Sequence, residues 1–226
     1  MRRLVVVILI GMLTILPIFS VGQVNPVSEI GGNIDSVKQD HLSYVEHPKF
    51  SIVGNDDFVT YFNGSGTAEQ PYTFEGQNIT GADALINITD TDAYCVIKDC
   101  FFRTVTGEPF GADAIVLDNA SHVTIEGCIF YDVAKIVEAT GSANLTIIDV
   151  LSDDIRASSI DLTSCPYANL TGNTVQGSFW TGTTNIKLTG CNYSHIIGNN
   201  LTSSRIIMNN SNETNAIDNI LYRSKL

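Results

Sequence analysis

The chain repeats one pattern over most of its length. Each unit begins with two mostly apolar residues separated by one spacer, and apolar residues recur ten and fifteen positions after the start, with Gly or Asp at position twelve. A chain with this kind of period must bury its apolar residues between successive units. The units are 20 to 29 residues apart and start at Ile86, Ile115, Val137, Ile160, Ile186 and Ile206.

The spacing inside each unit predicts strands. Apolar residues two apart follow the period of a β-strand, and Gly, Asp or Asn separates the short strands. No segment sustains the 3.6-residue period of a helix, which excludes helical repeats, and the units lack the multiple Leu of leucine-rich repeats. The pattern therefore predicts an all-β parallel β-helix, in which coils of two or three strands stack about 4.8 Å apart.

Position thirteen of the unit is polar where a core residue is expected. Asn173, Asn199 and Asn219 occupy it in three successive units. Stacked amides can bond one another and the turn backbone, whereas a single buried amide without partners is costly. We expect a structural Asn ladder, and a polar ligand-binding row is the alternative.

The repeat resembles the right-handed parallel β-helix proteins of the pectate-lyase-like superfamily, and in particular the NosD-like surface proteins of archaea. The stretch "FSIVGNDDFVTYFNGSGTAEQPYTFEGQNITG" is similar to the segment that such proteins place before their first coils. The resemblance implies a single-stranded right-handed solenoid of about six coils, with a cap and first strands at residues 50–85 and repeats at 86–226. It implies no single activity, because the superfamily includes lyases, hydrolases, epimerases, adhesins and proteins of no known activity.

The N-terminus has the form of an export signal. Arg2 and Arg3 precede a mostly apolar stretch at residues 4–19, and small residues follow at Ser20 and Gly22. We expect a signal peptide at 1–22, a polar linker or loose extension at 23–49, and a secreted or cell-surface protein with no membrane insertion after cleavage. A retained anchor is the alternative, although the stretch is shorter than the roughly 20 residues of a spanning helix.

The net charge of the chain and its glycosylation sequons limit the kinds of binding partner that we expect. The formal net charge of -12 argues against nucleic acid and anionic membrane surfaces, which attract basic patches. Asn-x-Ser/Thr sequons predict a glycosylated surface, although Asn and Thr also suit the turns of a repeat. The sequons start at Asn63, Asn78, Asn87, Asn119, Asn144, Asn169, Asn192, Asn200, Asn209 and Asn212.

One outward row is charged. Glu138, Asp161 and Lys187 follow the first residue of three successive units. Two carboxylates and an ammonium on neighbouring coils are suited to general acid/base chemistry on a uronic sugar. A solvated charge ladder that offsets its own repulsion is the structural alternative, and the one we favour.

Aromatic residues supply the candidate ligand contacts. Tyr167 and Tyr193 share position seven on neighbouring coils, which suggests either a stiffening stack or a platform for a glycan. Trp180, the only Trp, lies in the longest gap-free unit, where it either stacks on a sugar or covers the core.

The cysteines fall into two vertical pairs. Cys100 lies above Cys128, and Cys165 above Cys191, close enough for disulfides in an oxidising compartment; buried free thiols are the equal alternative. Cys95 has no partner in phase. The four His are too scattered to share an ion, so the sequence predicts no metal and no cofactor.

The sequence favours a surface module over an enzyme. We expect an exported, glycosylated β-helix that acts as a structural or recognition module, with glycans or other surface proteins as partners. The alternative is a lyase, hydrolase or epimerase acting on acidic polysaccharide. Few residues follow the last apolar positions, so the final coil is also a candidate for end-to-end association with a second copy or with another surface protein.

Overall fold

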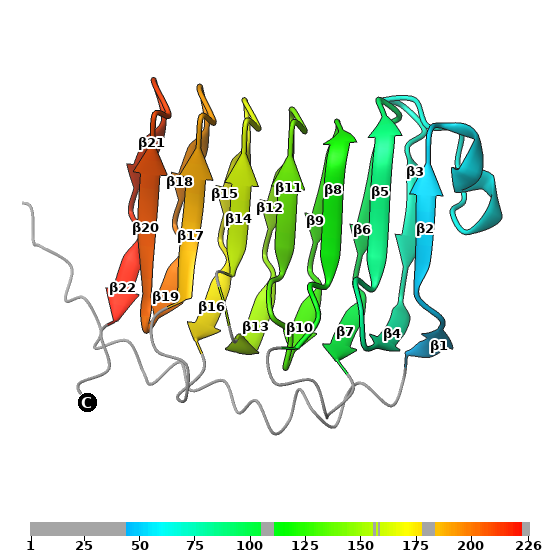
Figure 1. The fold of residues 1–226 in the computed structure, drawn as a ribbon, viewed down its shortest axis with the longest axis horizontal. Coiled ribbons are helices and arrows are strands. Elements are labelled where there is room, and N and C mark those ends of the chain that lie inside the picture. Colours follow the sequence, from blue (N-terminus) through cyan, green and yellow to red (C-terminus); the bar gives the residue numbers. More distant parts are fainter. Residues whose placement is uncertain (1–43, 105–110, 156, 158, 178–183, 223–226) are drawn as a thin grey trace, which may run out of the picture.

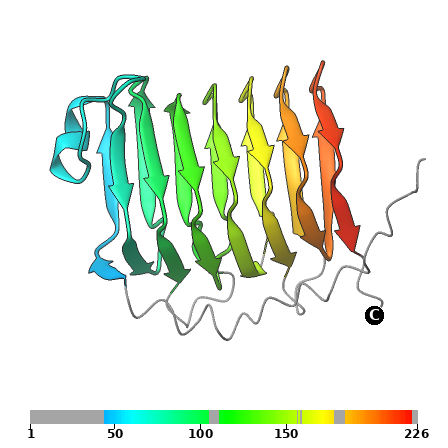
Figure 2. The same cartoon turned by 180° about the vertical axis from the view of Figure 1, so that it is seen from behind.

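The structure is a computed structural model that describes residues 44–104, 111–155, 157, 159–177 and 184–222. Its strands run in three parallel sheets that wrap around one core, and each strand pairs with the equivalent strand of the next coil (Figures 1 and 2). This arrangement confirms the predicted all-β parallel solenoid. The expected signal segment, most of the expected linker and Trp180 lie outside the described residues.

The sheets are named here in the order in which each coil visits them. Sheet I contains β2 (Phe50–Val53), β5 (Ile86–Thr91), β8 (Ile115–Ala120), β11 (Val137–Thr140), β14 (Ile160–Thr163), β17 (Thr184–Thr189) and β20 (Ser204–Asn209). Sheet II contains β3 (Tyr72–Glu75), β6 (Cys95–Lys98), β9 (Val123–Glu126), β12 (Thr146–Ile148), β15 (Asn169–Thr171), β18 (His195–Ile197) and β21 (Asn215–Ile217). Sheet III contains β1 (Val45–His47), β4 (Gln77–Gly81), β7 (Phe101–Thr104), β10 (Ile129–Tyr131), β13 (Leu151–Ile155), β16 (Thr174–Gly177), β19 (Asn200–Thr202) and β22 (Ile220–Tyr222).

The predicted unit starts pair directly with one another. Along sheet I the first residues of the six units are consecutive Cα partners, and Phe50 of β2 extends the same row by one coil. The segment expected to hold the cap and first strands therefore forms a coil of its own from β2, β3 and β4. The stack also starts earlier than residue 50, because β1 lies in the expected linker and pairs with β4.

An aromatic cap closes the N-terminal end. The 3-10 helix η2 (Asp56–Thr60) places Phe58 in the core, where its ring stacks on Tyr72 at 4.8 Å and meets Phe62 at 5.0 Å. Gly66 permits this packing, since a Cβ at this position, where φ is +75°, would lie 2.5 Å from the Tyr72 ring. A backbone bridge from Asn63 to Thr73 pairs the outer edge of β3. The first coil is therefore covered over sheets I and II.

Position twelve of the unit is Gly or Asp because the backbone there adopts a positive φ. Asp99, Gly127, Asp149, Gly172 and Gly198 make the turn from sheet II to sheet III with φ between 51° and 67°. This left-handed conformation is accessible to Gly and is tolerated by Asp and Asn better than by other residues. The row therefore turns the chain at the same height in successive coils and keeps the following strands in register.

The Asn ladder is confirmed. The Asn199 side chain is fully buried, and its Nδ2 donates to Leu170 O at 2.9 Å and to Asn219 Oδ1 at 2.8 Å. Its Oδ1 accepts the backbone N–H and the Nδ2 of Asn173, both at 2.9 Å. Each amide thus serves its own coil and both neighbours, so the polar row holds the turns together without leaving a buried donor or acceptor without a partner.

Asn199→Leu should lower the free energy of unfolding by about 1–3 kcal/mol, because it leaves buried polar groups of the neighbouring coils unbonded. Urea unfolding of the purified chain measures the change. Asn200→Leu is the matched control: the Asn200 Oδ1 has no hydrogen-bond partner, so its loss should be close to neutral. Equal unfolding midpoints for the two variants would rule out the structural ladder.

Candidate functional site

A charged cluster lies beside the outer face of sheet I. The register confirms that Glu138, Asp161 and Lys187 are successive neighbours, and Lys187 Nζ lies 3.3 Å from Asp161 Oδ2. The structure adds two residues to this row of three. Lys135 Nζ lies 2.7 Å from Glu138 Oε1 and 3.6 Å from Asp113 Oδ2, so the cluster contains three carboxyl groups and two ammonium groups over four coils.

Two of these carboxyls have displaced pKa values. Burial, together with a hydrogen bond to Glu138, raises the pKa of Asp113 to about 6, and the charge of Lys135 partly offsets this rise. Hydrogen bonds from Asp113 and Lys135 lower the pKa of Glu138. Below about pH 6 the proton of this pair therefore lies on Asp113, and an acid beside a carboxylate is the arrangement that general acid/base chemistry uses.

Sequence reasoning missed Asp113 and Lys135. Both stand two residues before the start of a unit, Asp113 before Ile115 and Lys135 before Val137. Both positions lie before the unit that the repeat defines, so the repeat pattern does not align them. Extending the register backward by two residues would have placed the two side chains on neighbouring coils.

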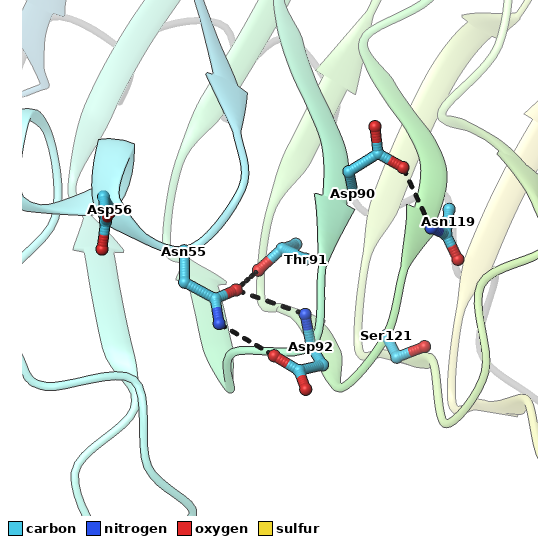
Figure 3. Close-up of a pocket in the computed structure, with 7 residues that line it drawn as sticks. All are labelled: Asn55, Asp56, Asp90, Thr91, Asp92, Asn119 and Ser121. Carbon is cyan, nitrogen blue, oxygen red and sulfur yellow. Dashed lines mark hydrogen bonds between the residues drawn. The ribbon is translucent and has the colours of Figure 1, made fainter.

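A second polar surface lies at the turn from sheet I to sheet II, which we call the turn face. Near the N-terminal end it contains an open depression of about 540 Å³ (Figure 3). Asn55 crosses between coils there: its Nδ2 donates to Asp92 Oδ1 at 2.8 Å, and its Oδ1 accepts from Thr91 Oγ1 at 2.5 Å. The depression presents carboxylates, amides and hydroxyls from three coils, and its lining residues are Asn55, Asp56, Asp90, Thr91, Asp92, Asn119 and Ser121.

Stacked rings continue along the turn face. Tyr94 and His122 stack with centroids 4.3 Å apart, and Tyr167 and Tyr193 stack at 5.3 Å. The second pair confirms the vertical pairing predicted from position seven. His122, Tyr167 and Tyr193 all have φ near 60°, so their side chains leave the backbone in the same direction. The row therefore forms an exposed aromatic ridge parallel to the solenoid axis.

One coil interrupts the ridge. Asn144 occupies the same turn position between His122 and Tyr167, with φ of 56° and an exposed side chain that makes no hydrogen bond within the described chain. Coils stack about 4.8 Å apart, so the two flanking rings start about 10 Å from each other. Only a short carboxamide lies between them. The ridge therefore consists of two aromatic pairs separated by a gap with an amide floor, which we call the Asn144 gap.

The sequons differ in accessibility. Asn63, Asn119, Asn144, Asn209 and Asn212 are exposed, and Asn87, Asn169, Asn192 and Asn200 are partly buried. Asn78 is buried, and its amide donates to Glu46 at 2.5 Å. Strand geometry accounts for part of the sequon excess, because Asn169 and Thr171 flank an inward Leu on β15 and bond each other at 2.7 Å. The exposed five are the better acceptors.

The five cysteines are buried free thiols in the structure, the second of the two states that the sequence left open. Cys100 and Cys128 each donate to a carbonyl of the preceding coil, as Asn173 does in the same row. Cys191 Sγ accepts the Cys165 backbone N–H at 3.4 Å. Both predicted pairs are therefore vertical neighbours, and their thiols take part in the inter-coil hydrogen bonding.

Two features are absent from the described residues. No group of three or more His, Cys, Asp and Glu side chains is arranged to hold a metal ion. In the same part of the chain, every helix is too short or too polar to cross a bilayer.

The Asp113 carboxyl should titrate with a midpoint near pH 6 in ¹³C NMR, and Lys135→Met should move that midpoint higher by removing the nearby positive charge. The folded pKa lies above the unfolded value of 3.8, so the contribution of Asp113 to stability falls as the pH rises from about 4 to about 6 and is constant above that range. A wild-type midpoint near pH 4 would contradict the buried, proton-sharing arrangement.

Comparison with known proteins agrees with this geometry. A model of the family described as "right handed beta helix region" matches residues 49–201. No curated protein and no solved structure matches the chain significantly. The matched region covers more than half of the chain and runs from the start of β2 into β19, so the chain belongs to the right-handed β-helix family.

Proposed function

We propose that this protein is an exported β-helix module that recognises neutral carbohydrate at the cell surface through its turn face. The Asn144 gap carries the proposal, since it is the one interruption between two stacked aromatic pairs. The signal peptide expected from the sequence and the four exposed sequons other than Asn144 support the location, and the Asn144 sequon must stay unmodified for the gap to admit a sugar. The polar depression, which adjoins the ridge through Ser121 and His122, supplies further hydrogen-bonding groups.

The dimensions of the gap fit one ring. The rings of the ridge stack at 4.3 and 5.3 Å, and two such spacings equal about 10 Å, the separation expected for residues two coils apart. A pyranose inserted between His122 and Tyr167 would therefore meet a ring face on each side, at the distance the ridge already uses. The Asn144 amide would lie beneath it as a donor and an acceptor for sugar hydroxyls.

Charge selects among carbohydrates. Asp56, Asp90 and Asp92 line the depression, none of its lining residues is Lys or Arg, and the whole chain carries a formal net charge of -12. Acidic polymers are repelled by such a surface, and carboxylates accept hydrogen bonds from neutral sugar hydroxyls. The turn face thus favours neutral glycans over polyuronates.

Asn144→Tyr should weaken neutral-glycan binding at least tenfold while leaving the fold intact, because a Tyr at this turn position fills the gap and joins the two stacks. Tyr already adopts the required backbone conformation at Tyr167 and Tyr193, where φ is 61° and 59°. A glycan array identifies the ligand, and isothermal titration measures affinity on protein made without N-glycans, so that Asn144 is unmodified.

Glu213→Tyr is the matched control, since it adds the same ring in the same row beyond Tyr193, where φ is 53°. It should bind like the wild type. Full affinity in the Asn144→Tyr variant would move recognition away from the gap, and the absence of binding to any neutral glycan at millimolar concentration would refute the proposed function itself.

The charged cluster supports a second candidate, acid/base catalysis on a polysaccharide, through the proton held between Asp113 and Glu138. The recognition proposal predicts that Glu138→Ala and Asp161→Ala keep the glycan affinity of the wild type. An assay for cleavage of neutral and uronate polymers decides between the two functions. Turnover by the wild type that is lost in either variant would establish the enzyme instead.

A further inference from the structure

The C-terminal coil, formed by β20, β21 and β22, ends the described stack with apolar side chains in the open. Met208 is 43% exposed, while Leu188 and Leu162 in the same row are fully buried. Leu221 is 48% exposed, while Leu201 beneath it is fully buried. Among the described residues, nothing covers the surface that every inner coil hides against its neighbour, because the described stack ends at this coil (Figure 1).

At four turn positions of the coil, the backbone amides donate toward the C-terminal end of the stack. In the first turn Ser164 N donates to Thr189 O, and Gly190 N to Asn209 O, both at 2.8 Å. Three parallel series end in the bonds from Tyr193 N to Asn212 O, from Gly198 N to Ile217 O and from Asn199 N to Asn219 Oδ1. In each of the four series, the next backbone amide has no acceptor among the described residues. These four amides are those of Asn210, Glu213, Asp218 and Asn219.

The amides at the start of β15, β18 and β21 in sheet II, and of the sheet III strands from β10 onward, donate in the opposite direction. His195 N donates back to Ala168 O, and Asn215 N to Ser194 O. Continuation of this series leaves the carbonyl of Thr214 available to a following coil. The last coil therefore presents donors at its turns and acceptors where β21 and β22 begin, in a fixed order along the chain.

That order selects the direction of a partner. A coil running parallel to the last one meets every donor with a carbonyl and every acceptor with an N–H, as the inner coils do. A second copy related by a two-fold axis would bring antiparallel strands and set turn donors in the wrong places. Head-to-tail stacking of two copies is opposed by the N-terminal cap, where η2 and the Asn63–Thr73 bridge already cover the first coil.

We propose that the C-terminal coil is a docking surface for an extended segment of a partner protein, which adds one parallel β-coil to the stack. The partner segment has apolar residues at alternate positions and a carboxamide or hydroxyl placed to accept from Asn219. This is β-augmentation, in which main-chain hydrogen bonds supply affinity and side-chain rows supply register. It is independent of the glycan function, because it uses the end of the solenoid and not its turn face.

A peptide of residues 204–222 is a suitable probe. In the intact chain this sequence already offers the carbonyls of Asn209, Asn212 and Ile217 and the Oδ1 of Asn219 to the coil before it. Hydrogen exchange by NMR follows the full chain with and without saturating peptide. We expect the amides of Asn210, Glu213, Asp218 and Asn219 to exchange fast in the free chain and at least tenfold slower with peptide.

Two variants sharpen the test. A peptide carrying Met208→Asp loses its apolar row and should give no protection, and Met208→Lys with Leu221→Lys in the protein should abolish protection by the normal peptide with little change in the urea midpoint. Fusing residues 204–222 through a flexible linker after Leu226 raises the effective concentration to millimolar, so a weak affinity in trans does not hide docking.

Three results would overturn the proposal. The first is unchanged exchange of the four amides with both the peptide and the fused coil. The second is slow exchange in the free monomer, which would mean that another segment of this chain covers the end. The third is slow exchange together with a dimer in light scattering, which would assign the surface to a second copy.

Discussion

Hydrogen bonding between coils is the constraint on which the rest of this structure depends. A strand of three to six residues cannot pair within its own coil, so its N–H and C=O groups find partners only in the coils above and below. This fixes the vertical register, and the register then decides which side chains touch. Asn173 meets Asn199, Tyr167 meets Tyr193 and Asp161 meets Lys187 because the register places the two residues of each pair at the same position of adjacent coils.

Inward and outward rows use this alignment differently. The polar groups of an inward row are shielded from water and need hydrogen-bond partners within the protein. For that reason Asn199 bonds both neighbouring coils, and the buried thiols likewise donate to carbonyls of a neighbouring coil. An outward row is free of that demand and can be interrupted. The Asn144 gap is such an interruption: the stacks on either side hold His122 and Tyr167 in place, and a ligand can enter without disturbing the core. Recognition is therefore compatible with a rigid scaffold.

The sequence predicted the features that follow from the repeat period and missed the residues that lie outside the repeated rows. Unit starts, the Asn ladder and the Tyr pair follow from counting residues, because each lies in a row shared by several coils. The polar depression depends on Asn55, which bonds Asp92 from a first coil whose phase the repeat does not define. Asp113 and Lys135 precede the counted pattern. The thiol state was open, because vertical neighbours satisfy the geometry of a disulfide and of a thiol hydrogen bond alike.

The two ends of the stack differ in kind. At the N-terminal end the chain departs from the repeat, and η2 places Phe58 and Phe62 over the first coil, so the apolar column is closed by residues that no inner coil has. At the C-terminal end the repeat continues unchanged into its last described coil, with the same rows and the same donor order as the interior. An interior surface left at an end has the specificity of the coil-to-coil contacts already present in the molecule. For this reason we expect its partner to be a polypeptide segment that pairs in register with the last coil, whereas a simple apolar patch would bind almost any apolar surface.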